Sequence, residues 1–289
     1  MKYGLLTYRE SYNLGDEIQS MAAAQFLPRL DFTVDREALS SLAIEEPATL
    51  ILNGWFMHHP ETWPPRANIR PLLTSMHISQ DASLENERGS LPHHHLLTGE
   101  KAEYFRRWGP VGGRDWHTVE LLVRHDIPAF WSGCLTLTLA RPQAAPQRED
   151  IVCSVDLEDP MFEHLRASSR TPVLGLSHLF PTYDAKAKFK RARELFELYA
   201  KAKAVVTTRL HCALPCLALG TPVLFIEAAR DRYRFDGLRD LMHHVDTDCF
   251  LADRHDFAFD SPPANPRYYL ALRRTLNDSV RRFITAAAA

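Results

Sequence analysis

The sequence lacks the features that mark several large classes of protein. It has no unbroken apolar run of the roughly 18 residues that a membrane-spanning helix needs. Its 34 basic and 36 acidic residues leave a net charge of -2, which excludes a strongly basic nucleic-acid-binding arm. Its start, MKYGLLTYRE, has too short an apolar stretch for a secretory signal peptide. We therefore expect a cytoplasmic protein, for which contact with a membrane surface stays open.

Cysteine is scarce, and no spacing in the sequence is typical of a metal site. The five cysteines are an odd number and lie mostly inside apolar runs, so we expect buried, reduced thiols. The zinc motif HExxH is absent, and the cluster His93–His95 has no second group of ligands at metal spacing, so we expect a solvated loop there. The sequence therefore favours neither a disulfide framework nor a metal centre.

Short apolar runs alternate with segments of helical period along the whole chain. This pattern is typical of parallel sheets that are covered by helices on both faces. Residues 141–150 hold two prolines and no apolar period, which indicates a linker. We predict an α/β protein with two doubly wound Rossmann-like domains, residues 1–140 and 151–289, that face a central cleft as in GT-B folds. The last helix has the length to cross back over the first domain.

The same pattern gives the expected elements of both domains. Expected strands are 3–7, 32–36, 49–54, 72–78, one near Val111, 129–132, 151–155, 173–177, 204–208 and 222–226. Expected helices include 16–27, 116–125, one from Asp159, 185–203, one after His211, one around 235–244, and 266–284.

In a parallel sheet, ligands bind beyond the carboxyl ends of the strands, so residues after strands are the candidates. Asn13, Gly15 and Asp16 follow the first strand. Gly15 allows a close turn, Asp16 can cap the next helix, and the free amides of that helix favour an anion or a sugar hydroxyl. A capped turn that binds nothing explains the same residues, and by themselves they favour it.

A second candidate is the segment Gly112–Asp115, which precedes a helix. Asp115 is placed to cap this helix, and Arg114 is then held at the edge of the sheet. A guanidinium there can form a bidentate pair with a carboxylate or a phosphate. A surface arginine paired with a local acid is an equally good interpretation.

The strongest candidate follows an apolar strand and consists of Thr208, Arg209 and His211. Because Leu210 is expected to face the core, Arg209 and His211 can point the same way. Pro215 is best tolerated in the first turn of a helix, so we expect that helix to start close to His211. A guanidinium, an imidazole and free amides together predict a site for a small, multiply charged anion with an acid/base group beside it.

Four segments of the chain together resemble one known family. They are NLGDEIQS (13–20), GGRDWHTVELL (112–122), SGCLTLTL (132–139) and TTRLHCALPCLALGTPV (207–223). In these segments the chain resembles the polysaccharide pyruvyl transferase family, whose members are similar in fold to two-domain GT-B glycosyltransferases. The last segment is the most specific, and the likeness spans most of the sequence.

The resemblance implies that Arg209, Leu210 and His211 bind phosphoenolpyruvate, and that Arg114 contacts the same donor. His211 and Arg209 are the candidate catalytic residues. The candidate substrate-binding residues are Arg114, Asn13, Gly15, Asp16, Thr208 and, on the acceptor side, Asn53. The acceptor would be a glycan precursor of a cell-surface polysaccharide or exopolysaccharide, which can be lipid-linked at the inner membrane surface. No metal, cofactor or nucleic acid is implied.

The donor's chemistry is consistent with these roles. Phosphoenolpyruvate carries a carboxylate and a phosphate, so two separate arginines suit its recognition. His211 suits the proton transfers of ketal formation, while both arginines would neutralise charge as phosphate departs. Two alternatives stay open. One is a nucleotide-sugar glycosyltransferase of the same form, with Glu227 on a ribose, and the other is a non-catalytic glycan-binding protein.

Overall fold

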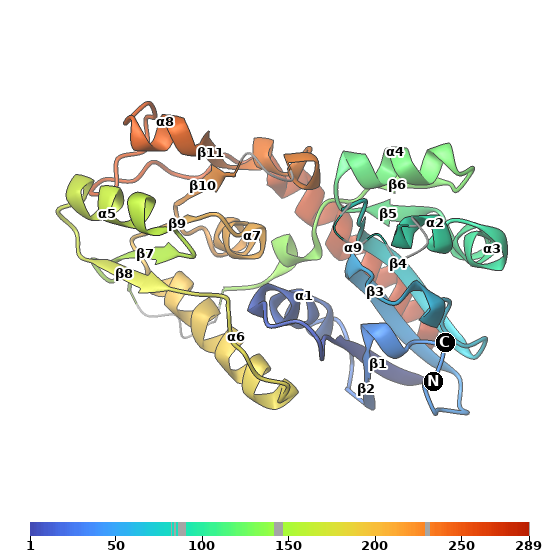
Figure 1. Ribbon diagram of the computed structural model, residues 1–289. Coiled ribbons are helices and arrows are strands. Elements are labelled where there is room, and N and C mark those ends of the chain that lie inside the picture. Colours follow the sequence, from blue (N-terminus) through green and yellow to red (C-terminus); the bar gives the residue numbers. More distant parts are fainter. Residues whose placement is uncertain (82, 84, 86–90, 142–146, 229–231, 289) are drawn as a thin grey trace. The chain divides into compact units, whose positions relative to one another are not determined.

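The computed structural model describes residues 1–81, 83, 85, 91–141, 147–228 and 232–288 (Figure 1). The chain folds into two compact units. The first contains residues 1–9, 22–135 and 274–289, and the second contains residues 10–21 and 136–273. Each unit is a parallel sheet interleaved with helices, so the predicted α/β class with two Rossmann-like halves is confirmed.

The first unit is built on a six-stranded parallel sheet in the order β2-β1-β3-β4-β5-β6. Its strands are β1 (Lys2–Thr7), β2 (Phe32–Asp35), β3 (Ala48–Phe56), β4 (Ile69–Ile78), β5 (Val111–Gly113) and β6 (Ala129–Trp131). Its connecting helices include α2 (Pro92–Leu96), α3 (Gly99–Trp108) and α4 (Trp116–Arg124). All six strands expected from the sequence of this half are confirmed.

Strand β3 is longer than the sequence pattern indicates, and this changes the position of Asn53. We expected the strand to end at Gly54, so that Asn53 would lie at its end. The strand instead continues to Phe56, and its pairing with β4 shifts register between Leu52 and Gly54. The irregularity lies at Gly54, whose backbone has a φ of +116°. Residues other than glycine rarely adopt this angle. Asn53 is therefore a buried residue inside a strand.

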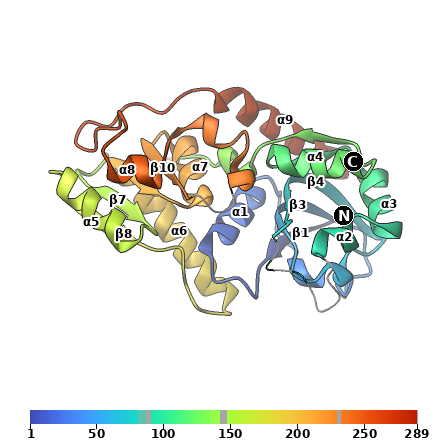
Figure 2. The same ribbon diagram turned by 45° about the horizontal axis from the view of Figure 1, so that its top comes forward.

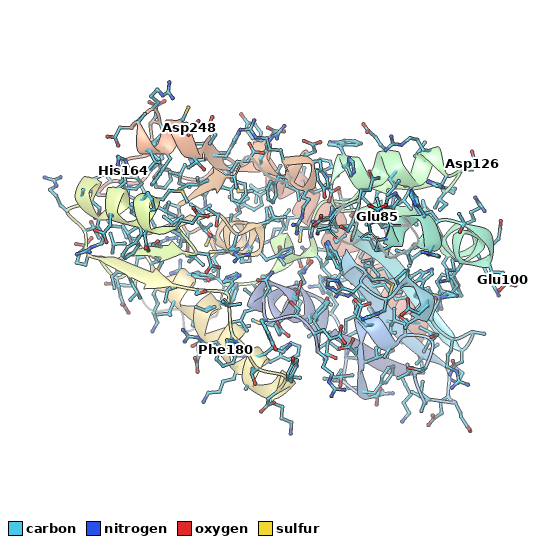
Figure 3. All side chains as sticks on the ribbon, viewed as in Figure 1. Glu85, Glu100, Asp126, His164, Phe180 and Asp248 are labelled. Carbon is cyan, nitrogen blue, oxygen red and sulfur yellow. The ribbon has the colours of Figure 1, made fainter. Side chains whose placement is uncertain are left out.

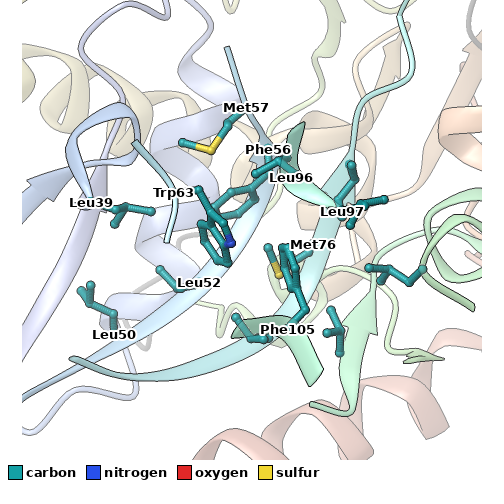
Figure 4. Close-up of a cluster of buried hydrophobic side chains, with 14 of the residues drawn as sticks. Leu39, Leu50, Leu52, Phe56, Met57, Trp63, Met76, Leu96, Leu97 and Phe105 are labelled. Carbon is teal, nitrogen blue, oxygen red and sulfur yellow. The ribbon is translucent and has the colours of Figure 1, made fainter. Parts of the chain in front are cut away.

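Aromatic side chains form the centre of the first unit's core (Figure 4). The Trp63 ring stacks on Phe105 with 4.7 Å between ring centroids. Phe56 and Tyr104 meet the Trp63 ring edge-on, at 5.8 and 5.2 Å. Since Trp63 is 1% exposed, its indole contributes both a large buried area and favourable ring geometry.

The second unit is built on a five-stranded parallel sheet in the order β11-β10-β9-β7-β8. Its strands are β7 (Val152–Val155), β8 (Val173–Leu176), β9 (Ala204–Thr207), β10 (Val223–Glu227) and β11 (His243–Asp246). Figure 2 shows α5 (Asp159–Ser168) and α8 (Thr247–Leu251) on one face, with α6 (Ala185–Lys201) and α7 (Leu210–Leu219) on the other. The strand order reverses its direction between β7 and β9, so this is the topological switch point of the sheet.

The prediction of a helix around residues 235–244 is wrong. Two short 3-10 turns, Arg232–Phe235 and Arg239–Leu241, lead there into β11, which pairs in parallel with β10. The apolar spacing in this stretch fits a helix, but the open edge of β10 offers a full ladder of backbone hydrogen bonds. Tertiary pairing therefore overrides local periodicity.

Two helices carry the chain from one unit to the other. They are α1 (Leu14–Ala24) and α9 (Tyr269–Ala288), so the units differ from the contiguous domains that we expected. In the first unit, the end of α9 contacts β4, because the Arg70 guanidinium donates to the carbonyl of Ala286 and lies over Phe283. Residues 142–146, inside the expected linker, lie outside the described residues. None of the helices in the described part of the chain is both long and apolar enough to span a bilayer.

Replacing Trp63 by alanine should destabilise the first unit by about 3–5 kcal/mol, because it removes the stacked indole and leaves a cavity. The control is Trp116→Ala, because this side chain is 46% exposed and stacks on Trp131 at 5.3 Å, so its loss should cost about 1–2 kcal/mol. Urea unfolding followed by far-ultraviolet circular dichroism measures both. Equal losses in the two variants would contradict the packing described for Trp63.

Candidate functional site

Two charged side chains meet at the switch point of the second unit. Asp156 directly follows β7, and Arg209 follows β9 after Thr208. The Nε of Arg209 donates to Oδ2 of Asp156 over 2.7 Å. This places Arg209 where ligands of doubly wound sheets bind. The sequence predicted Arg209 here but gave no indication of Asp156.

Asp156 is fixed from several directions. Its backbone adopts φ +52°, a left-handed conformation that aspartate tolerates better than most residues. Its carboxylate accepts the Ser177 hydroxyl over 2.6 Å and the His178 amide over 3.1 Å. Burial opposes ionisation, but these hydrogen bonds and the Arg209 charge outweigh it and hold the pKa of Asp156 below its usual value.

Arg209 is anchored at its backbone, while its guanidinium faces solvent. It is the N-cap residue of α7, and its amide donates to the Thr207 hydroxyl over 2.9 Å. The Thr208 hydroxyl donates to the carbonyl of Asp156 over 3.0 Å, so the two loops are joined twice. The Arg209 side chain is 44% exposed. Among the described residues its two terminal nitrogens have no hydrogen-bond partner, so they can bind an anion.

His211 and Gly15 lie against each other, although they are far apart in the sequence. A methyl group placed on Gly15 would lie 3.0 Å from Cβ and 3.3 Å from Nδ1 of His211. Only glycine allows this approach without displacing the imidazole. Gly15 and His211 are each the second residue of a helix, α1 and α7, so the N-terminal turns of the two helices meet here. Their amides give this place a positive electrostatic potential.

The turn before α1 is capped differently from our expectation. Asn13 precedes the helix, and its side-chain oxygen accepts the Gly15 amide over 3.1 Å. Asp16, expected as the cap, is the third residue of α1 and bonds Ser11 and Gln19 instead. The sequence permits either residue as the cap, since asparagine and aspartate are about equally effective.

Residues 10–21 belong to the second unit because they are tied to the chain after β8. The Leu14 amide donates to the carbonyl of His178 over 2.9 Å, and the Phe180 amide donates to the carbonyl of Tyr12 over 2.8 Å. Figure 3 labels Phe180 in the connection between β8 and α6. A buried ion pair of 3.2 Å joins Glu17 on α1 to Lys188 on α6.

Pro215 does not lie in the first turn of its helix, as we expected. Helix α7 begins at Leu210, which does confirm a start close to His211, and Pro215 is its sixth residue. It has no N–H to donate to the carbonyl of His211, four residues earlier. The helix continues past it because this segment is almost entirely buried, so packing compensates for the lost bond.

Arg114 lies in the first unit and is buried, with 1% of its side chain exposed. Asp115 caps α4 through the Thr118 amide, as the sequence predicted. Its carboxylate also contacts His77 Nδ1 at 2.7 Å and Arg114 Nε at 3.5 Å. Burial disfavours the charge, but His77 and Arg114 lower the pKa of Asp115 to about 2. The role of Arg114 in donor binding stays a prediction.

A family model described as polysaccharide pyruvyl transferase matches residues 13–228, about three quarters of the chain. The chain belongs to the polysaccharide pyruvyl transferase family. The matched region contains every residue singled out from the sequence, as well as Asp156 and Ser177. No match was found among curated proteins.

Other features of this pyruvyl transferase family member involve neither Arg209 nor His211, although Ser177, which bonds Asp156, lines the first of them. A groove of about 930 Å³ beside the edge strand β8 is lined by residues that include Phe162, Phe180, Lys190 and Glu194, but not Arg209 or His211. Glu227 ends β10, and its carboxylate is paired with Arg239 over 2.9 Å. The five cysteines are free thiols, of which four are buried and Cys249 is half-buried.

The structure gives no indication of a metal centre in its described parts. They contain no group of three or more histidine, cysteine, aspartate or glutamate side chains placed to share an ion. The cluster His93–His95, expected in a solvated loop, instead forms part of the short helix α2, with His93 buried.

Glu17 should make the protein less stable as the pH rises. Burial raises its pKa to about 7, against the opposing effect of Lys188, so its stabilising contribution is complete below about pH 4.5 and lost as pH passes 7. Between pH 5 and pH 8, wild type should lose about 2 kcal/mol more unfolding free energy than Glu17→Gln. Urea unfolding at both pH values tests this. The exposed control Glu158→Gln should behave as wild type, and an unchanged slope in Glu17→Gln would contradict the assignment.

Proposed function

We propose that this transferase of polysaccharide biosynthesis moves the pyruvyl group of phosphoenolpyruvate onto sugar hydroxyls of a glycan precursor, forming a pyruvate ketal. One observation carries the proposal. Arg209, oriented by Asp156 at the switch point of the second unit, is followed two residues later by His211, and there two helix N-termini meet. Family membership supports the transfer reaction, and the geometry supports the donor.

The donor fits the charge of this place. Phosphoenolpyruvate is small and carries two anionic groups, which suit an exposed guanidinium beside the N-terminus of α7. The terminal nitrogens of Arg209 can bind one group in bidentate fashion, with the first amides of α7 beside it. A contact between Arg114 and the donor is proposed from family resemblance alone. In the first unit the Arg114 side chain is 1% exposed and lies 3.5 Å from Asp115.

The chemistry then proceeds by proton transfer and charge neutralisation. A proton is added to the terminal methylene carbon of the enol, and a sugar hydroxyl attacks the adjacent carbon while losing its own proton. Phosphate departs with the electrons of its C–O bond, and a second hydroxyl attacks the resulting cation and loses its proton. His211 serves as the acid and base, and Arg209 stabilises the departing phosphate. No step calls for a metal or an organic cofactor.

A nucleotide-sugar glycosyltransferase is the main alternative, and one contact counts against it. Such an enzyme would use Glu227 to bind a ribose, but this carboxylate is already paired with Arg239 and has Arg232 3.9 Å away. Only 7% of the Glu227 side chain is exposed, so a ribose has little access to this carboxylate. The second alternative is a glycan-binding protein without catalysis, and measurable turnover would exclude it.

Substitutions of the two proposed catalytic residues should have different effects. Arg209→Ala should weaken phosphoenolpyruvate binding at least tenfold, because it removes a charge-assisted contact. His211→Ala should leave binding within a few-fold but lower turnover by about 100-fold or more. Titration calorimetry with phosphoenolpyruvate measures binding, and phosphate release with a panel of sugar glycosides as acceptors measures turnover.

Matched controls are Arg166→Ala and His244→Ala, which remove the same side chains from exposed positions of the second unit. Both should behave as wild type. Binding of nucleotide sugars in preference to phosphoenolpyruvate would favour the glycosyltransferase, and binding without phosphate release from any acceptor would favour the non-catalytic protein.

The proposed setting is the cytoplasm, with the enzyme peripheral to the inner membrane where lipid-linked glycan precursors are found. The surface of α6 supports attachment. Lys186, Lys190 and Arg193 recur at helical spacing on one exposed face, and Leu179 and Tyr183 just before the helix are 62% and 64% exposed. Basic side chains beside exposed apolar ones are typical of surfaces that bind anionic lipid.

The protein should therefore sediment with vesicles that contain phosphatidylglycerol and not with pure phosphatidylcholine. Reversing the charges of Lys186, Lys190 and Arg193 to glutamate should reduce this binding at least tenfold, since each basic residue contributes about 1 kcal/mol. The control reverses three exposed arginines elsewhere in the second unit, Arg166, Arg170 and Arg254, and should retain binding. Equal binding to neutral vesicles would contradict a charge-driven attachment.

A further inference from the structure

We propose that Asp156 is a positioning residue for the donor, which fixes the plane of the Arg209 guanidinium so that its two terminal nitrogens face phosphoenolpyruvate. The inference rests on the proposed function, and it concerns a residue that the sequence alone does not single out. Its basis is the set of contacts around one carboxylate at the switch point of the second unit.

The Asp156 carboxylate receives three donors, each from a defined direction. Its Oδ1 accepts the Ser177 hydroxyl over 2.6 Å, and its Oδ2 accepts the His178 amide over 3.1 Å and Arg209 Nε over 2.7 Å. Ser177 and His178 follow β8, so the chain beyond one strand orients the carboxylate, and the carboxylate orients the arginine beyond another. Because only 12% of the Asp156 side chain is exposed, water competes little for these bonds.

Backbone hydrogen bonds of Asp156 also restrict the position of its carboxylate. The Asp156 amide donates to the carbonyl of Leu176 over 3.0 Å, and the Asp156 carbonyl accepts the Thr208 hydroxyl over 3.0 Å. The left-handed backbone at Asp156 turns the side chain out of the strand direction. Both ends of the Asp156–Arg209 contact are thus attached to the strands, so the pair has little freedom to rotate.

The consequence for Arg209 follows from the shape of a guanidinium. Nε and the two terminal nitrogens lie in one plane, so a bond at Nε determines where the other two point. An exposed arginine without such a bond samples many rotamers and loses this freedom when it binds an anion. Asp156 reduces that loss by preorganising the guanidinium before the donor arrives.

Positioning and charge predict opposite changes in anion affinity when Asp156 is neutralised. Asp156 is negative and lies next to the proposed anion site, so neutralising it should tighten the binding of an anion if charge were its whole contribution. Positioning predicts weaker binding instead. Asparagine is neutral, so its carbonyl oxygen holds the Arg209 Nε–H less strongly than the charged carboxylate does, and the guanidinium is freer to rotate.

A double-mutant cycle with Arg209→Lys separates positioning from a merely structural role. In the wild-type background, Asp156→Asn should raise the dissociation constant of phosphoenolpyruvate about tenfold or more, with KM for the acceptor unchanged. In the Arg209→Lys background the same change should not weaken binding, because a lysine has no guanidinium plane for Asp156 to fix and only the effect of charge remains. A structural defect would weaken binding in both backgrounds.

The matched control is Asp246→Asn, an aspartate of the same unit that accepts the Cys249 amide and caps α8. It should leave phosphoenolpyruvate binding unchanged. If Asp156→Asn does not fold, Ser177→Ala carries the test, since it removes one donor from the carboxylate and should weaken binding a few-fold in the Arg209 background only. Melting temperatures identify any variant that is unfolded.

The outcomes are distinct. The inference would be overturned if Asp156→Asn bound phosphoenolpyruvate as tightly as wild type or more tightly. An equal loss of affinity in the wild-type and Arg209→Lys backgrounds would overturn it too. Neither result would affect the proposed function. A wild-type protein that binds no phosphoenolpyruvate would overturn the proposed function and, with it, this role of Asp156. An Arg209 Nε–H proton seen by NMR in wild type and lost in Asp156→Asn would support the geometry independently of turnover.

Discussion

The contact between Asp156 and Arg209 depends on the strand order of the second sheet. Because β7 and β9 are neighbours in the sheet although β8 lies between them in sequence, their carboxyl ends open side by side where the winding changes direction. Each strand contributes one charged residue just beyond its end, and a 2.7 Å hydrogen bond joins them. A different order would separate these residues, so the topology is itself part of the site.

The periodicity of the sequence was sufficient for most of the fold, because buried parallel strands form short apolar runs that are easy to distinguish from charged helices. It failed where local preference and tertiary pairing disagree. The stretch up to His244 has the apolar spacing of a helix, yet residues 243–246 become a strand because β10 offers an open edge. Gly54 indicated a strand end, yet a register shift allows β3 to continue, and such a shift leaves no trace in composition.

The candidate site was predictable in its local parts and not in its long-range contacts. Arg209 and His211 could be predicted because both follow directly after one apolar strand. The glycine turn, residues 13–16, could be predicted from its residue types. Asp156 could not be predicted, since a single aspartate after a strand is common, and only the fold shows that its carboxylate meets Arg209. The cap of α1 shows the same limit, because Asn13 and Asp16 differ only in which backbone amides they reach.

The membership of residues 10–21 in the second unit explains why the glycine turn and the Arg-Leu-His segment form one site. The domain boundary expected at residues 141–150 would place the glycine turn in the first domain. Composition indicates where a linker lies, but it does not indicate which contacts a helix makes. Hydrogen bonds to His178, the buried pair of Glu17 with Lys188, and the close approach of Gly15 to His211 hold the start of α1 in the second unit. Within that unit, therefore, the two segments keep their geometry as one body, and chemistry at His211 requires no further element to place Gly15 beside it.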